Sequence, residues 1–143
     1  MTRTLKKIIC AVDFSACSDA MISYAAEMGC KETELIILHI ASENEQNKGI
    51  HGMHLHEFSR YSNILEPHGS NIRFALQHGD PAAGILGYAA EQQADMIMLG
   101  SHGSTALTRL LVGSTAEMVM RQAECPVMVM KTPDNQTKKH GTT

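Results

Sequence analysis

The residues most suited to chemistry in this chain are glycines and hydroxyl side chains in two short segments. The apolar run 95–99 leads into Gly100-Ser101-His102-Gly103 and, nine residues later, into Gly113-Ser114-Thr115. Glycine lets a backbone approach a ligand closely, and the first N–H groups of a helix favour a bound anion. A strand end, a glycine loop and a helix start at this spacing predict a phosphate-binding site.

The second segment also carries the signs of a helix start. Ser114 followed by Glu117 predicts a capping box that opens a helix running to about Ala123. Its inward stripe is predicted to be Ala116, Val119 and Met120. Capping does not prevent Ser114 from donating to phosphate, because a hydroxyl both donates and accepts.

The loop residues also allow other interpretations. Gly100 and Gly103 are also compatible with a tight turn alone. His102 is either a general acid or base or a residue that only shapes the loop. Arg109 either contacts phosphate or is solvated, and no lysine completes a Walker pattern.

The elements that must position these residues alternate along the chain. Five apolar runs predict strands, at Lys7 to Val12, Glu34 to Ile40, Asn71 to Gln77, Asp95 to Gly100 and Pro126 to Lys131. Four helical patterns lie between them, at about Cys17 to Cys30, His54 to Pro67, the stretch after Asp80-Pro81, and Ser114 to Ala123. Apolar strands separated by helices predict a doubly wound α/β fold with a parallel sheet.

In such a sheet, ligands bind beyond the carboxyl ends of the strands, where the winding direction reverses. The residues at the ends of the first, second and fourth strands are Asp13, Ile40 and Gly100. The Asp13 carboxylate either accepts hydrogen bonds from a ligand or satisfies N–H groups of its own loop. These residues are therefore candidate binding residues beside the glycine loop.

Five segments together resemble the universal stress protein family. They are Ile8 to Ser15, Leu38 to Ile40, Gly79 to Pro81, the glycine stretch from Gly100 to Thr115, and Pro126 to Val129. The resemblance covers about Lys6 to Lys131. It implies a five-stranded parallel sheet in the order 3-2-1-4-5, a Rossmann-like fold of the adenine nucleotide alpha hydrolase type, and the family's ATP-binding branch.

The resemblance also implies a role for each site residue. Asp13 would lie beside the adenosine, the Ile40 main chain would meet the adenine edge, and Gly100 would pass close to the ribose. The phosphates would face Gly103, Gly113, Ser114 and Thr115. ATP is the expected cofactor, and AMP or another adenosine nucleotide is an alternative. Magnesium would accompany ATP, but no metal ligands are assigned because only Asp13 among the carboxylates is well placed.

The expected function is that of an ATP-binding stress-response protein, a nucleotide-dependent sensor or regulator. No base, water-positioning residue or set of magnesium ligands is evident, so no catalytic residue is assigned. Two rivals remain: a slow ATPase or self-phosphorylating protein that uses His102 or a loop hydroxyl, and a nucleotide-free protein-interaction regulator. The sequence names neither the stress, the pathway nor the regulated protein.

Composition limits the remaining choices. The chain has 143 residues, enough for one domain, expected over residues 1–131. Its net charge of −3 argues against nucleic acid as a partner. The first apolar run is too short for a secretory or membrane segment, and the four cysteines form no C-x-x-C pair, so a cytoplasmic location without membrane insertion is expected.

With no tryptophan and 4% aromatic residues, methionine is expected to fill much of the core. The methionines assigned to the core are Met96, Met98, Met118, Met120, Met128 and Met130. The histidines His51, His54 and His56 are expected to be surface residues. The polar tail 132–143 is expected to be mobile.

The last strand, Pro126 to Met130, is expected at an edge of the sheet. A bare apolar edge invites aggregation, and pairing with the same strand of a second copy would close it. A homodimer through this strand is therefore expected, as the resemblance also implies.

Overall fold

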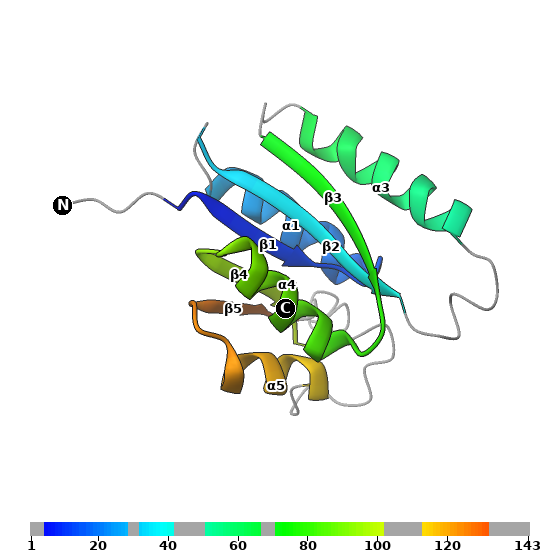
Figure 1. Ribbon diagram of the computed structural model, residues 1–143. Coiled ribbons are helices and arrows are strands. Elements are labelled where there is room, and N and C mark those ends of the chain that lie inside the picture. The colour runs from blue at the N-terminus through cyan, green and yellow to red at the C-terminus, as the bar shows by residue number, and fades with distance from the viewer. Residues whose placement is uncertain (1–4, 29–31, 42–50, 67–70, 102–112, 132–143) are drawn as a thin grey trace, which may run out of the picture.

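A computed structural model describes residues 5–28, 32–41, 51–66, 71–101 and 113–131 of the chain (Figure 1). Strands and helices alternate through these residues, which confirms the predicted α/β pattern. The elements are β1 (Lys7–Ala11), α1 (Ala16–Met28), β2 (Glu34–Ala41), α3 (His51–Leu65), β3 (Asn71–His78), α4 (Pro81–Gln92), β4 (Met96–Gly100), α5 (Ser114–Gln122) and β5 (Val127–Met130).

The strands form one five-stranded parallel sheet in the order β3-β2-β1-β4-β5, as expected. The chain winds from β1 outward to β3 and then returns through α4 to β4, on the other side of β1. The direction of winding therefore reverses between β1 and β4. This reversal defines the switch point of the sheet.

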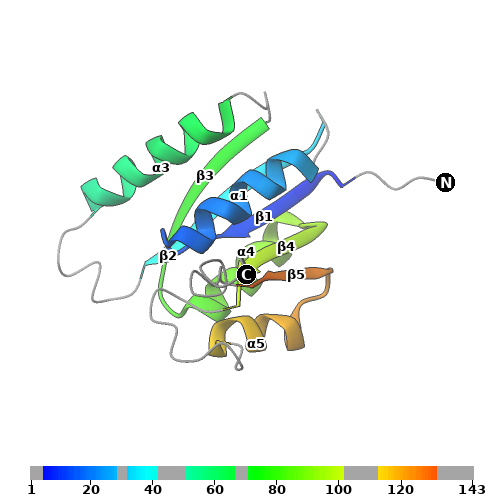
Figure 2. The same cartoon turned by 180° about the vertical axis from the view of Figure 1, so that it is seen from behind.

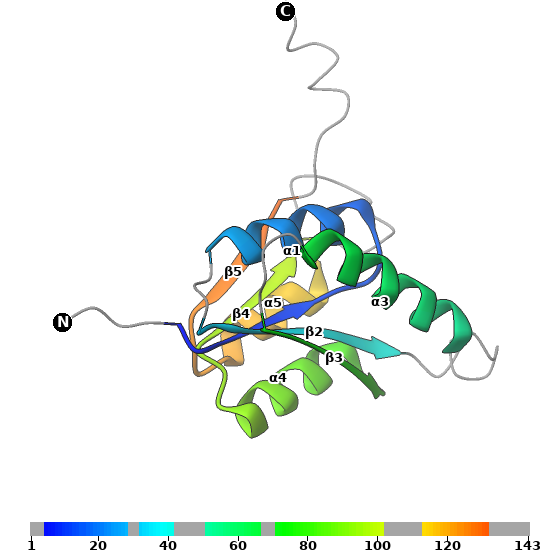
Figure 3. The same ribbon diagram turned by 90° about the horizontal axis from the view of Figure 1, so that it is seen from above.

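Helices cover both faces of the sheet (Figure 3). Helices α1 and α3 lie over one face, seen in front in Figure 2, and α4 and α5 lie over the other. Because successive strand residues point to opposite faces, Ile8 and Cys10 join the core under α1 and α3, whereas Ile9 joins the core under α4 and α5. Both faces of the central strands are buried, which explains their continuous apolar sequences.

The start of α4 follows from its sequence. Asp80 is the N-cap, and its carboxylate accepts a hydrogen bond from the Ala83 N–H at 2.9 Å. Pro81 occupies the first turn, where its missing N–H costs nothing. Gly79 has a φ of 126°, which side chains rarely tolerate, so glycine is required at this turn.

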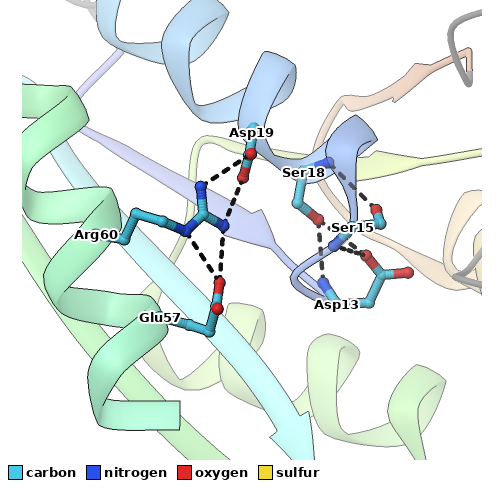
Figure 4. Close-up of polar contacts among 6 residues, drawn as sticks. All are labelled: Asp13, Ser15, Ser18, Asp19, Glu57 and Arg60. Carbon is cyan, nitrogen blue, oxygen red and sulfur yellow. Dashed lines mark hydrogen bonds and ion pairs between the residues drawn. The ribbon is translucent and has the colours of Figure 1, made fainter. Parts of the chain in front are cut away.

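An ion-pair cluster joins α1 to α3 (Figure 4). The Arg60 guanidinium donates two hydrogen bonds to Asp19, at 2.9 and 3.0 Å, and two to Glu57, at 2.7 and 3.2 Å. Hydrogen bonds from Arg60 to the two carboxylates raise the pKa of its guanidinium above the ordinary value. The cluster fixes the lateral position of α3 on α1.

The surface of α5 corrects one expectation. Ala116 and Val119 are buried as predicted, but the side chains of Met118 and Met120 are 42% and 44% exposed. Assignment of these two methionines to the core was therefore wrong, because a nine-residue helix on an edge of the sheet buries only a narrow stripe. Met98 is fully buried and Met96, Met128 and Met130 pack partly into the core, as expected.

Strand β5 lies at one edge of the sheet, as predicted, and its four residues are all partly buried. No helix in the described part of the chain is long and apolar enough to cross a membrane. The tail 132–143 falls outside the described residues.

Candidate functional site

The carboxyl ends of β1, β2 and β4 meet at the switch point. In the sheet register, Ala11 lies between Leu38 and Leu99, so β1 and β4 end within one residue of each other, while β2 runs on to Ala41. Pairing continues one residue past β1, because the Val12 N–H donates to the Leu38 carbonyl at 2.8 Å. The sheet therefore brings together the ends of the three strands that carry Asp13, Ile40 and Gly100, as the sequence predicted.

Asp13 sits in a tightly bonded loop between β1 and α1 (Figure 4). Its Oδ1 accepts the Ser15 N–H at 3.0 Å and the Ser18 hydroxyl at 3.0 Å. The Ser18 Oγ in turn accepts the Asp13 N–H at 3.1 Å. Oδ1 therefore serves the loop, which is one of the two roles considered for Asp13, while Oδ2 has no hydrogen-bond partner among the described residues.

Ring contacts of Phe14 and a hydrogen bond of His39 anchor this loop to the fold. Phe14 adopts a left-handed φ of 65°, unusual for a residue with a side chain, and its ring packs 4.5 Å from His39 and 5.5 Å from Phe58. The His39 ring lies with Nδ1 2.8 Å from the Val12 carbonyl. Because a carbonyl can only accept, Nδ1 carries the proton in this contact. These contacts fix the direction in which the loop leaves β1.

Strand β4 and helix α5 are joined at the same end of the sheet. The Ser101 N–H donates to the Met130 carbonyl at 2.8 Å, and the Gly113 N–H donates to the Ser101 carbonyl at 2.6 Å. Ser101 and Gly113 therefore lie next to each other at the end of β4. The hydrogen bond holds the N-terminus of α5 at the carboxyl end of β4, the strand that lies next to β1.

The cap of α5 differs from the predicted capping box. Gly113, not Ser114, is the N-cap, and it makes no side-chain capping bond. Ser114 is the first residue of the helix, and the side chain of Glu117 pairs with Arg121 at 2.8 Å. The Gly113 φ of −63° is open to any residue, so backbone conformation does not require glycine there. Ser114 and Thr115 lie in the first turn, where N–H groups lack acceptors within the helix.

Ile40 is held from the α4 side. Its side chain is buried, and a Cβ added at Gly84 would lie 2.8 Å from the Ile40 Cδ1. Gly84 therefore lets α4 approach β2 closely at Ile40, near the carboxyl end of β2.

Some predicted residues fall outside the described part of the chain. Gly103, His102 and Arg109 are among them, as are the side chains of His51 and His54. His56 is exposed. Among the described residues, no three side chains of the types that bind metals gather in one place.

The chain is a doubly wound α/β protein in which the Asp13 loop follows β1 and the N-terminus of α5 is held at the end of β4. The chain belongs to the universal stress protein family, whose profile matches residues 4–131. The universal stress protein MJ0577 of Methanocaldococcus jannaschii is 29% identical over 158 aligned residues, covering 92% of this chain and 98% of the relative. MJ0531 of the same organism is 41% identical, but over 70 residues, 49% of this chain and 41% of the relative.

Solved structures share the fold. The structure of MJ0577 matches with a TM-score of 0.79 and 27% identity, covering 93% of this chain and all of that chain. An Arabidopsis thaliana universal stress family protein, solved with AMP bound, has a TM-score of 0.71 and 18% identity, with 92% and 95% coverage. An Archaeoglobus fulgidus universal stress protein, solved in complex with dAMP, has a TM-score of 0.70 and 23% identity, with 92% and 100% coverage. A universal stress protein in complex with cAMP has a TM-score of 0.72 and 18% identity, with 92% and 100% coverage.

Sequence reasoning missed the residues that hold Asp13. Ser15 caps α1, since its carbonyl accepts the Asp19 N–H at 3.2 Å and its hydroxyl lies 3.4 Å from the Ser18 N–H. The spacing Ser15-x-x-Ser18 was a usable signal for a helix start. The left-handed Phe14 had no such signal, because its conformation depends on ring contacts with residues distant in sequence.

Proposed function

We propose that this protein binds ATP or a closely related adenine nucleotide and acts as a nucleotide-dependent sensor or regulator. One observation carries the proposal: the Gly113 to Ser101 hydrogen bond holds the N-terminus of α5 at the end of β4, and β4 pairs with β1, the strand that leads into the Asp13 loop. A helix N-terminus at a switch point favours phosphate, and a carboxylate oxygen nearby accepts from a nucleoside. The carboxyl edge of the sheet therefore offers donors for the phosphates and an acceptor for the nucleoside.

In the proposed complex, the phosphates face the backbone of Gly103 and Gly113 and the hydroxyls of Ser114 and Thr115. The absence of a backbone reason for Gly113 supports this, since a glycine with an ordinary φ leaves room for a neighbouring group. The remaining contacts lie on the nucleoside. Asp13 accepts from it, Ile40 meets the adenine edge through its main chain, and Gly100 lies near the ribose.

Related structures support the choice of ligand class. Relatives have been solved with AMP, dAMP and cAMP, which share an adenine and one phosphate. The length of the polyphosphate is the finer part of the proposal. It rests on the glycine spacing, with magnesium accompanying ATP when it binds. In this proposal the protein is a cytoplasmic homodimer that pairs through β5. It regulates a partner protein.

A thermal-shift titration tests the proposal. Any nucleotide released by denaturing the purified protein is identified first, and then ATP, AMP and GTP are titrated. Ligand at 100 times Kd adds about 2.7 kcal/mol to the free energy of unfolding, which raises Tm by about 5–11 °C in a domain of this size. No released nucleotide and no shift with any adenine nucleotide at millimolar concentration would overturn the proposal.

Gly113→Val separates the phosphate site from the fold. The new side chain fills the space proposed for phosphate, so the ATP-dependent shift is lost, while weaker capping costs about 1 kcal/mol of unfolding free energy. Gly87→Val is the matched control, because a Cβ at Gly87 meets no atom within 4 Å. The control keeps the full ATP shift.

A further inference from the structure

Ser18 makes a reciprocal pair of hydrogen bonds with Asp13 (Figure 4). It lies in the first turn of α1 and is 4% exposed. Its Oγ accepts the Asp13 N–H at 3.1 Å and donates to the Asp13 Oδ1 at 3.0 Å. A serine hydroxyl has one hydrogen and two lone pairs. Here a lone pair accepts the Asp13 N–H, and the hydrogen is donated to the Asp13 carboxylate.

The two oxygens of Asp13 are consequently unequal. Oδ1 receives two donors, the Ser18 hydroxyl and the Ser15 N–H at 3.0 Å. Oδ2 receives none from the described residues, and Figure 4 shows it pointing away from the loop. With its backbone N–H and one oxygen both tied to Ser18, the Asp13 side chain is held in a single orientation. A carboxylate oxygen accepts hydrogen bonds, so Oδ2 is an acceptor of fixed orientation at the end of β1.

We infer that Ser18 is a positioning residue that gives the site its nucleoside selectivity. By holding Asp13, it aims Oδ2 at one donor of the nucleoside, either a ribose hydroxyl or the adenine amino group. Ligands lacking that donor leave a desolvated acceptor unpaired and bind more weakly. The inference rests on the proposed function, because it deepens the same binding site.

A purely structural role for Ser18 makes a different prediction. If its hydroxyl only satisfies the Asp13 N–H, its loss lowers stability and weakens all nucleotides equally. If it positions Oδ2, its loss weakens chiefly the ligands that carry the donor. Selectivity between ligands is therefore the readout that a structural role would not move.

The test compares ATP with three analogues, each lacking one donor: 2′-deoxy-ATP, 3′-deoxy-ATP and inosine triphosphate. Their Kd values are measured by calorimetry with the wild type, Ser18→Ala and Ser62→Ala, which removes an exposed serine hydroxyl from α3. The wild type and Ser62→Ala are expected to prefer ATP over one analogue by about tenfold. In Ser18→Ala that preference falls to about twofold, through weaker binding of ATP.

Two further variants keep the test decisive if Ser18→Ala does not fold. Ser18→Cys fills the space with a weak donor and should also lose the preference, whereas Ser18→Thr retains a hydroxyl and should keep it. An unchanged preference in Ser18→Ala and Ser18→Cys, or a wild type that binds all four ligands equally, overturns the inference. A wild type that binds no adenine nucleotide overturns the proposed function itself.

Discussion

Phe14 shows how one strained residue can shape a site. Its left-handed φ of 65° turns the chain so that the Ser15 N–H meets the Asp13 carboxylate. For a residue with a side chain, this conformation costs about 1–2 kcal/mol. Ring contacts with His39 and Phe58 offset that cost. The strain is thus balanced by packing beneath the loop.

Replacing Phe14 separates the cost of its left-handed backbone from the contribution of its ring contacts. Phe14→Ala loses the ring contacts and is expected to lower the free energy of unfolding by about 2–3 kcal/mol, less than for a fully buried phenylalanine. Phe14→Gly loses the same contacts but relieves the backbone, so it should be no less stable than Phe14→Ala. Urea denaturation measures both. A free energy of unfolding about 1 kcal/mol lower for Phe14→Gly than for Phe14→Ala would show that the left-handed backbone carries no strain.

At the residue scale, types were easier to predict from sequence than hydrogen-bond partners. Asp13 could be placed at the end of a strand beside the switch point because it directly follows a buried apolar run. The different environments of its two oxygens could not be predicted, because they depend on the orientation of the Ser18 side chain in the first turn of α1. Ser114 shows the opposite error: its type suits an N-cap, but the closure through Ser101 makes Gly113 the cap.

At the scale of elements, the approach of α4 to β2 depends on Gly84. A Cβ there would lie 2.8 Å from the Ile40 Cδ1 and 3.2 Å from its Cγ1 and Cγ2. Because Cγ2 is fixed to the Cβ of Ile40, rotation of the side-chain end alone does not clear the contact. The helix therefore presses on the residue that is proposed to meet the adenine.

Two alanine substitutions on α4 test this packing. Gly87→Ala enters open space and should raise the free energy of unfolding by about 0.8–1.0 kcal/mol through helix propensity. Gly84→Ala gains the same propensity but overpacks Ile40, so it should be at least about 1 kcal/mol less stable than Gly87→Ala. It should also weaken ATP binding, which Gly87→Ala leaves unchanged. Equal stability and equal affinity in the two variants would contradict the packing argument.

At the scale of the whole molecule, burial of acidic groups sets the alkaline limit of stability. Burial raises the pKa of the Cys10 thiol from its ordinary value of 9.0 to about 12. It also raises the pKa of the Tyr61 phenol and of the Cys125 thiol. Between pH 9 and 12 the unfolded chain loses the Cys10 proton while the folded chain keeps it. Stability is therefore full below pH 9 and falls as pH rises.

The Cys10 contribution is measurable as a slope. One proton released on unfolding lowers the free energy of unfolding by up to about 1.4 kcal/mol per pH unit. Urea denaturation between pH 8 and 11 measures how the free energy of unfolding declines with pH. In Cys10→Ala this decline should be shallower than in the wild type by up to this amount. Parallel slopes for the two proteins would mean that the Cys10 thiol ionises equally in both states.

The outer edge of β5, on which no other described strand pairs, yields a prediction about assembly. The carbonyls of Pro126 and Met130 point to β4, so the backbone groups of Val129, on the alternate positions, face the open edge. We expect light scattering to give twice the chain mass at micromolar concentration. Val129→Pro removes one outward N–H and should give a folded monomer, whereas Val129→Thr keeps the N–H and should remain a dimer. A monomeric wild type would contradict the expected homodimer.

The overall architecture was predictable because it depends on periodicity, which short-range sequence patterns carry. Alternating apolar strands and amphipathic helices require a covered parallel sheet, and the described residues contain it. The strand order, by contrast, was expected only from the family resemblance. The surface of α5 was not predictable in the same way. Whether Met118 and Met120 are buried depends on how far a helix overhangs the last strand, which is a property of the assembled sheet.

The central claim is that backbone donors at the start of α5 and the Asp13 carboxylate bind an adenine nucleotide together. The most direct measurement is an NMR titration of the labelled protein with ATP, following the backbone amides. The account predicts saturable shifts concentrated at Gly113, Ser114, Thr115 and the Asp13 loop. Saturating ATP that leaves these amides unmoved, or that shifts a different surface alone, would contradict it.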